Sequence, residues 1–285
     1  MINRARGFVF VAAAYACALT VACAVLRAPL GYPVLVRCAL ADLAATVTVF
    51  GFSVFANNTS VYDPYWSVMP PALAAFLAAS FGAGARGVLI VSLVTLWGAR
   101  LTLNWARGWG GLAHEDWRYV GFRKLGRGYW PVSFFGLQLF PSVMTFLGCL
   151  PLFFSLGTNA PLGPWDFAGA LVALTATTLE AVADEQLRAF RRRGVPGAIC
   201  DVGLWRWSRH PNYFGEICFW AGLELFGVAA GAPWWTAAGV IAMVALFVFA
   251  SIPLAEKRSL ERRPGFAEHR RRVSMLIPLP PRAGR

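Results

Sequence analysis

The segment Gly203–Glu216 holds the densest group of residues whose types and spacing could do chemistry. His210 comes directly before Pro211, with Arg209 and Arg206 just upstream. Proline is favoured in the first turn of a helix, where its missing N–H costs nothing. A helix start offers free N–H groups and the positive end of the helix dipole. Together with these cations it predicts a site for an anion such as pyrophosphate. The structural alternative is a capped helix with arginines beside the membrane.

Acidic residues inside apolar segments form a second group of candidates. Asn212 and Glu216 are four residues apart, and Glu180, Asp184 and Arg188 recur at the same spacing, so each set shares one face of a helix. Charged residues within membrane helices are costly and are therefore functional candidates. Glu180 and Asp184 lie within reach of lipid, so they need a partner or a polar ligand, such as a ribose or an adenine amine.

A third group lies on the segment Trp97–Arg107. Arg100 and Asn104 share a helix face, and no acid close in sequence pairs with this arginine. An arginine inside the membrane requires an anion from elsewhere. Two sources stay open, which are a phosphate of a ligand and the carboxylate of Glu180 or Glu216 across a helical bundle.

The composition shows what must position these residues. The chain has 285 residues, of which 58% are hydrophobic and 14% charged, whereas soluble domains are about 25% charged. This excludes a soluble enzyme. The net charge of +12 is clustered between apolar segments, which argues against a nucleic-acid partner. The three histidines are far apart and the six cysteines form no C-x-x-C pair, so we expect no metal site.

Apolar runs predict an all-α fold, a polytopic transmembrane bundle of seven or eight helices in one membrane domain spanning residues 1–285. The run at 68–81 is short for a span, which leaves the number of helices open. The predicted runs are Phe8–Leu26, Cys38–Ala56, Val68–Phe81, Gly87–Trp105, Pro131–Leu156, Trp165–Leu187, Phe214–Ala230 and Trp234–Leu254.

The distribution of lysine and arginine predicts the orientation of these spans. With eight spans and both termini in the cytosol, 22 of the 26 basic residues lie on the inner side. The chain is therefore expected in the inner membrane if the source is bacterial, or in the endoplasmic reticulum if it is eukaryotic, in contact with membrane lipids.

Five segments, in this order, resemble the steroid 5-alpha reductase-like superfamily, and most closely its microbial branch with an R-H-P-N-Y-F-G-E block. They are VYDPYWSV (61–68), LWGARLTLNWARGWGG with HEDWRY (96–119), EAVADEQLRAFRRR (180–193), GLWRWSRHPNYFGE (203–216) and EKRSLERRPGFAEHRRR with LIPLPP (256–281). The resemblance implies a bundle that holds NADPH in a pocket open to the cytosol and a lipid substrate that enters from the bilayer.

The resemblance also implies that the two parts of the chain have different roles. Residues 1–86 would form helices on the substrate side, and 87–285 would form the cofactor-binding core. The family's cofactor contacts would fall on Arg100, Asn104, Glu180, Asp184, Arg191, Asn212, Tyr213, Glu216 and Arg258. Arg206, Arg209 and His210 join them through the anion site described above.

The chain departs from the steroid-reducing members at the catalytic positions. Where those members have a tyrosine that polarises the substrate ketone, this chain has Trp97, and no glutamate precedes Glu115. The nearest available proton donors are Tyr65 and Asp63, which we predict to be catalytic.

We therefore expect NADPH-dependent reduction of an activated C=C bond in a hydrophobic enone or enal, steroid-like or another lipid. The alternative is an S-adenosylmethionine-dependent lipid or isoprenylcysteine methyltransferase, a relative with a similar R-H-P-x-Y-x-G helix start. The surplus of arginines favours a polyanionic dinucleotide over a zwitterionic sulfonium compound. A non-catalytic membrane scaffold is the third interpretation.

Overall fold

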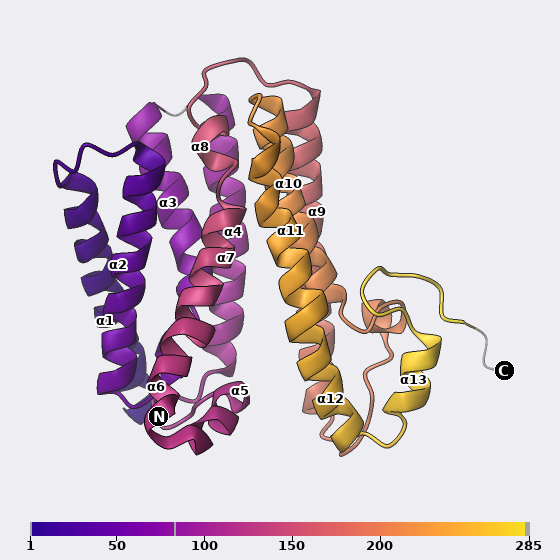
Figure 1. Ribbon diagram of the computed structural model, residues 1–285. Coiled ribbons are helices and arrows are strands. Elements are labelled where there is room, and N and C mark those ends of the chain that lie inside the picture. Colours follow the sequence, from indigo (N-terminus) through magenta and orange to yellow (C-terminus); the bar gives the residue numbers. More distant parts are fainter. Residues whose placement is uncertain (1, 83, 283–285) are drawn as a thin grey trace.

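The computed structural model describes residues 2–82 and 84–282, and over these residues it consists of helices and loops without a β-strand (Figure 1). The prediction of an all-α bundle is therefore confirmed. Its longer helices are α1 (Ile2–Arg27), α2 (Val34–Phe55), α3 (Tyr65–Phe81), α4 (Ala85–Gly108), α7 (Phe140–Gly148), α9 (Pro164–Arg192), α10 (Pro211–Ala229), α11 (Ala238–Ala245) and α12 (Ile252–Arg262).

Short helical segments connect and extend these helices. The α-helical ones are α5 (Trp117–Val120), α6 (Tyr129–Val132), α8 (Leu152–Ser155) and α13 (Phe266–Arg272). The 3₁₀ segments are η1 (Thr59–Val61), η2 (Gly121–Gly128), η4 (Gly203–Arg206) and η5 (Trp234–Ala237). Two π-helical segments, η3 (Ser133–Leu139) and η6 (Leu246–Ser251), each run directly into a helix with proline in its first turn.

Six continuous helical stretches are long and apolar enough to cross a membrane. They are Arg4–Arg27, Val34–Phe55, Ala85–Gly108, Trp117–Gly148, Pro164–Arg192 and Trp234–Arg262. The shorter helices α3 and α10 run alongside them, α3 against α4 and α10 against α9 (Figure 1). The chain therefore forms a multi-pass helical membrane bundle.

The packing of the helices brings the N-terminal and C-terminal halves together. Helices α1 and α2 pack as a pair, as do α3 and α4, and α4 in turn packs on α9. Helix α11 covers α7 and α10. The candidate residues on α4, α9 and α10 therefore face a common interior.

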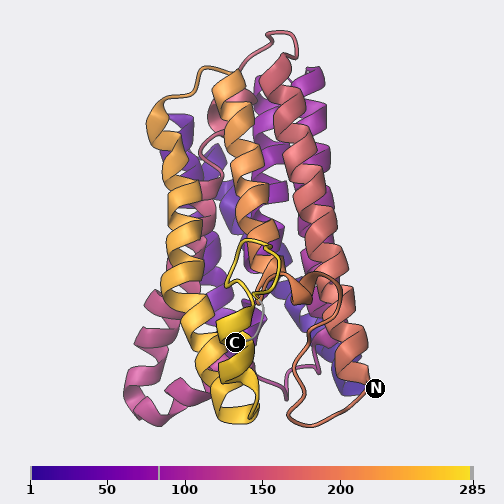
Figure 2. The same ribbon diagram turned by 90° about the vertical axis from the view of Figure 1, so that its right-hand side faces the viewer.

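One end of the bundle carries α5, α12 and α13, and we call it the basic end (Figures 1 and 2). Helix α1 begins there, since the Arg4 guanidinium donates to the carbonyl of Ala106, near the end of α4, at 2.6 Å. The segment that follows α13 folds back against the start of α10, because the backbone N–H of Arg209 donates to the carbonyl of Ser274 at 2.9 Å.

A line of glycines allows α9 and α10 to approach closely. A Cβ atom on Gly215 would overlap the Glu180 side chain and lie 3.0 Å from the Ala176 carbonyl oxygen. Further along, Gly169 and Gly222 face each other with similarly little room. Small residues at helix interfaces let the backbones come together in membranes. This contact places the acids of α9 beside the first turns of α10.

We expect Gly215→Val to destabilise the fold, because the added methyl groups must displace Glu180 or the α9 backbone. Overpacking of this kind costs about 1–3 kcal/mol and lowers the midpoint of thermal unfolding by about 5 °C. Gly51→Val is the matched control, since a Cβ atom at Gly51 meets nothing within 4 Å. Thermal unfolding in detergent measures both variants, and equal midpoints would contradict the close packing.

Candidate functional site

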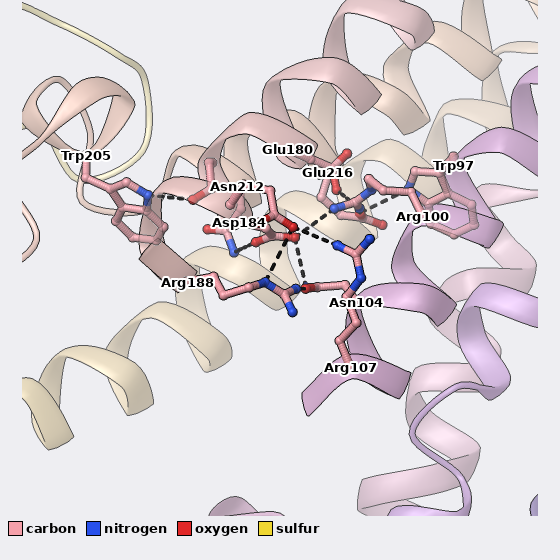
Figure 3. A network of polar contacts seen from close by, with 12 residues as sticks. Trp97, Arg100, Asn104, Arg107, Glu180, Asp184, Arg188, Trp205, Asn212 and Glu216 are labelled. Carbon is pink, nitrogen blue, oxygen red and sulfur yellow. Dashed lines mark hydrogen bonds and ion pairs between the residues drawn. The ribbon is translucent and has the colours of Figure 1, made fainter. Parts of the chain in front are cut away.

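Arg100 on α4 is the centre of a polar network inside the bundle (Figure 3). Its Nη1 donates to Asp184 Oδ2 at 2.9 Å, and its Nη2 contacts Glu180, both on α9. The Oε2 atom of Glu216 on α10 lies 4.0 Å from Nη2. Of the two partners that the sequence left open for this arginine, the structure shows carboxylates across the bundle.

Two asparagines extend the network, and both were predicted to be site residues. The Nδ2 of Asn104 donates to Asp184 Oδ2 at 3.0 Å, and its Oδ1 accepts from Arg188. From α10, the Nδ2 of Asn212 lies 3.5 Å from Asp184 Oδ1. The structure thus brings the predicted residues of α4, α9 and α10 into one connected set.

Two tryptophans that sequence reasoning did not assign hold Glu216 in place. The indole Nε1 of Trp97 donates to Oε2 at 3.1 Å, and that of Trp220 donates to Oε1 at 2.9 Å. Both indoles are fully buried. The signal was present in the sequence, because Trp220 follows Glu216 by one helical turn.

The network contains more carboxylates than it has directly paired cations. Glu180, Asp184 and Glu216 surround the single guanidinium of Arg100. The Oε1 of Glu180 and the Nε of Arg100 are buried and have no hydrogen-bond partner among the residues that the structure describes. Buried polar atoms are almost always satisfied in proteins, so unpaired atoms here indicate that the network is incomplete without a ligand or water.

Beside this network lies a cavity of about 500 Å³ at the basic end, which we call the basic cavity. Five arginines line it and, among the residues that the structure describes, no carboxylate does. They are Arg191, Arg209, Arg258, Arg262 and Arg263. The lining also includes Asn212, so one side chain belongs to both the cavity and the network. A pocket of this size and charge suits an anionic small molecule.

The electrostatics of the basic cavity agree with its lining. Burial and the charge of Arg191 lower the pKa of Arg263. Burial and the charge of Arg209 lower the pKa of His269, which also lines the cavity. Both lowered pKa values show that the positively charged side chains of the cavity repel one another. An anion bound in the cavity would reduce this repulsion.

Aromatic rings border the same cavity. The guanidinium of Arg258 lies over the ring of Trp117, 3.9 Å from its centroid. Tyr213 is stacked between His210 and Phe247, with centroid distances of 5.3 and 4.6 Å. These contacts hold Tyr213 and Arg258, both predicted cofactor contacts, in fixed positions on the cavity wall.

Arg209 and His210, predicted to bind an anion, are engaged with the protein itself. The Nε of Arg209 donates to Glu256 Oε1 at 2.7 Å, and its Nη1 donates to the carbonyls of Arg270 and Val273. His210 Nε2 lies 3.3 Å from the same carboxylate oxygen. We call this set, with Ser208, the tail clamp, because Ser208 Oγ also donates to the carbonyl of Leu276 at 2.7 Å.

The remaining predicted cofactor residue, Arg206, lies outside the basic cavity. It lines a separate, open hollow with Asp201, Glu268 and Arg272, in which acids and bases are mixed. The structure therefore does not bring Arg206 together with the other cofactor residues.

The two predicted catalytic residues lie in the N-terminal half and contact neither the network nor the basic cavity. The hydroxyl of Tyr65 donates to Asp42 Oδ1 at 2.8 Å. Asp63 accepts from the hydroxyl of Tyr119 at 2.6 Å. Burial raises the pKa of Asp63 to about 6, although the charge of Arg118 opposes the shift.

Asp42 is a candidate that sequence reasoning missed. Together with Tyr65 and Tyr15 it provides the polar groups of an otherwise apolar cavity between α1, α2 and α3. The signal was a lone carboxylate within the second apolar run. As for metals, no three acidic, histidine or cysteine side chains come together to bind an ion in the described part of the chain.

Known proteins resemble the chain over most of its length. Residues 49–273 match the family described as "Protein of unknown function (DUF1295)". The chain is 28% identical over 260 residues to the uncharacterized protein C594.04c of Schizosaccharomyces pombe. This alignment covers 81% of the chain and 75% of the yeast protein. No solved structure matches the chain. The family match includes the whole network and every residue that lines the basic cavity.

We expect Glu256→Gln to loosen the tail clamp, because Arg209 would keep a buried charge without its counter-ion. Breaking a buried ion pair costs about 3–5 kcal/mol, so tryptic cleavage at Arg270–Arg272 should become about tenfold faster or more. The control is Glu261→Gln, an exposed position on the same helix. Cleavage followed by mass spectrometry compares them, and identical rates would show that Glu256 does not hold the tail.

Proposed function

The chain belongs to the DUF1295 family of proteins of unknown function, and we propose that it is a membrane-embedded, NADPH-dependent reductase of an activated C=C bond in a hydrophobic enone or enal. One observation carries the proposal. A cavity lined by five arginines and no carboxylate, within the described residues, adjoins a buried polar network through Asn212. The resemblance to the steroid 5-alpha reductase-like superfamily supports the same reaction class.

The residues present fit a dinucleotide phosphate. The guanidinium groups of Arg191, Arg258 and Arg262 offer bidentate donors to phosphate oxygens, which ammonium groups do not. The unpaired buried atoms of Glu180 and Arg100 offer hydrogen-bonding capacity to a sugar or an amide. A zwitterionic sulfonium cofactor would leave most of the cavity's positive charge uncompensated, and this favours NADPH over S-adenosylmethionine.

In the proposed reaction, bound NADPH supplies a hydride to the β-carbon, and a proton adds to the α-carbon, which yields NADP⁺ and the saturated carbonyl compound. The protein's part is to position the reactants and to stabilise the enolate-like charge in a site without water. The hydroxyl of Tyr65 is our candidate for the group that hydrogen-bonds to the carbonyl oxygen; it donates to Asp42 Oδ1 in this structure and would turn to donate to the substrate. The carboxyl of Asp63, with a pKa of about 6, is the second candidate for a proton donor.

The location of Tyr65 supports a hydrophobic substrate. The cavity that it shares with Asp42 is lined by aliphatic and aromatic side chains of α1, α2 and α3. A ligand with an apolar body and one oxygen atom fits such a lining, because a few polar groups orient it while the rest of its surface is buried.

We expect Arg191→Ala to weaken NADPH binding by about tenfold or more, since a charge-assisted hydrogen bond contributes about 1.5–3 kcal/mol. Arg192→Ala is the matched control, because this neighbour on the same helix does not line the cavity. Titration of the purified protein with NADPH measures both. Binding of S-adenosylmethionine in place of NADPH would contradict the reductase assignment and favour methyl transfer.

We expect Tyr65→Phe to lower kcat by about tenfold or more and to leave the Kd for NADPH unchanged, because Tyr65 lies outside the basic cavity. Tyr15→Phe is the control in the same cavity, since its hydroxyl donates to the carbonyls of Val61 and Tyr62. NADPH oxidation with a panel of long-chain enals and enones measures the rates. An unchanged kcat would remove Tyr65 from the mechanism.

A further inference from the structure

Carboxylates gather where a polyanionic ligand is expected. We call Glu180, Asp184 and Glu216 the carboxylate cluster (Figure 3). All three lie beside the guanidinium of Arg100 and, in the part of the chain that the structure describes, form an ion pair with no other guanidinium. The next cation, Arg188, donates instead to Asn104 and lies 3.4 Å from Glu185. Three carboxyl groups thus share one guanidinium, and any two of them, when ionised, outweigh its positive charge.

The carboxylate cluster and the basic cavity divide the site by charge. The cavity contributes arginines, and the cluster contributes acids of which Glu180 is only 2% exposed and has an unpartnered Oε1. Asn212 lines the cavity and contacts Asp184 at 3.5 Å, so the two regions adjoin. A ligand that extends from one to the other must be anionic at one end and neutral or cationic at the other.

A nicotinamide dinucleotide phosphate has this distribution of charge. Its phosphates are anionic in both redox states, whereas its nicotinamide ring is neutral when reduced and carries one positive charge when oxidised. We propose that the carboxylate cluster sets the preference of the protein for the redox state of its cofactor by stabilising the positive charge of the oxidised ring. This inference rests on the proposed function and adds a specificity-determining role for the three acids.

The size of the effect follows from the surroundings of the cluster. A unit charge several ångströms from a carboxylate, at an effective dielectric constant of about 20, gains enough energy to change an equilibrium constant by about tenfold or more. The acids are already in place, so they would stabilise the charge of the oxidised ring and thereby favour hydride donation to the substrate over the reverse reaction.

Dissociation constants for NADP⁺ and NADPH, measured on the purified protein, test the inference. Asp184→Asn removes a carboxylate that contacts both Arg100 and the cavity residue Asn212, and it keeps the size of the side chain, so we expect the Kd for NADP⁺ to rise about tenfold and that for NADPH to change less than threefold. Glu185→Gln, which also removes an acid of the same helix but at an exposed ion pair with Arg107, should leave the ratio of the two constants unchanged.

Three other outcomes overturn the inference and separate it from the proposed function. An equal loss of affinity for both forms would place a redox-independent group, such as a ribose, at the carboxylate cluster. Unchanged affinities for both forms would show that no part of the cofactor reaches the carboxylate cluster. Failure of the wild-type protein to bind either form would contradict the proposed function itself. Glu216→Gln, with its thermal unfolding followed in parallel, serves as a second variant if Asp184→Asn does not fold.

Discussion

Burial of charge inside a membrane-spanning bundle is the constraint on which the rest of the structure depends. A guanidinium in hydrocarbon is costly unless carboxylates lie beside it. Arg100 meets this condition with Glu180 and Asp184 on α9 and with Glu216 on α10. Because these partners come from two other helices, the contacts that neutralise the arginine also hold α4 against α9 and α10. The close approach of α9 and α10 at Gly215 makes this arrangement sterically possible.

The spacing of polar residues along single helices was informative about this network. The four-residue interval predicted that Arg100 and Asn104 share a face, and the same interval on α9 predicted a face with Glu180 and Asp184. The structure joins both faces. Whether Arg100 faces a phosphate or a carboxylate depends on which helix lies opposite, and periodicity within one helix does not contain that information.

Contacts between residues distant in sequence explain what was not predicted. Arg209 and Glu256 are far apart in sequence and meet because α11 packs on α10 and continues through η6 into α12, which carries Glu256. A cluster of cationic residues before a helix has the same amino-acid pattern whether it binds a ligand or the carbonyl groups of the protein itself. Asp42 was missed for a related reason, since its partner Tyr65 lies on another helix. By contrast, the all-α class followed from the sequence, because the few charges indicate a membrane protein and most of the apolar runs are long enough for a helix to span the bilayer.

The tail clamp has a consequence for how the protein is made. Phe266 and His269 form part of the wall of the basic cavity, and Leu276 and Leu279 hold them there through Ser208 and Trp207. These residues follow the membrane helices in the chain, so the ribosome adds them after those helices. The wall of the basic cavity is therefore completed only once the bundle has been synthesised, and a chain that stops before Phe266 would keep its membrane helices but lack one side of the cavity.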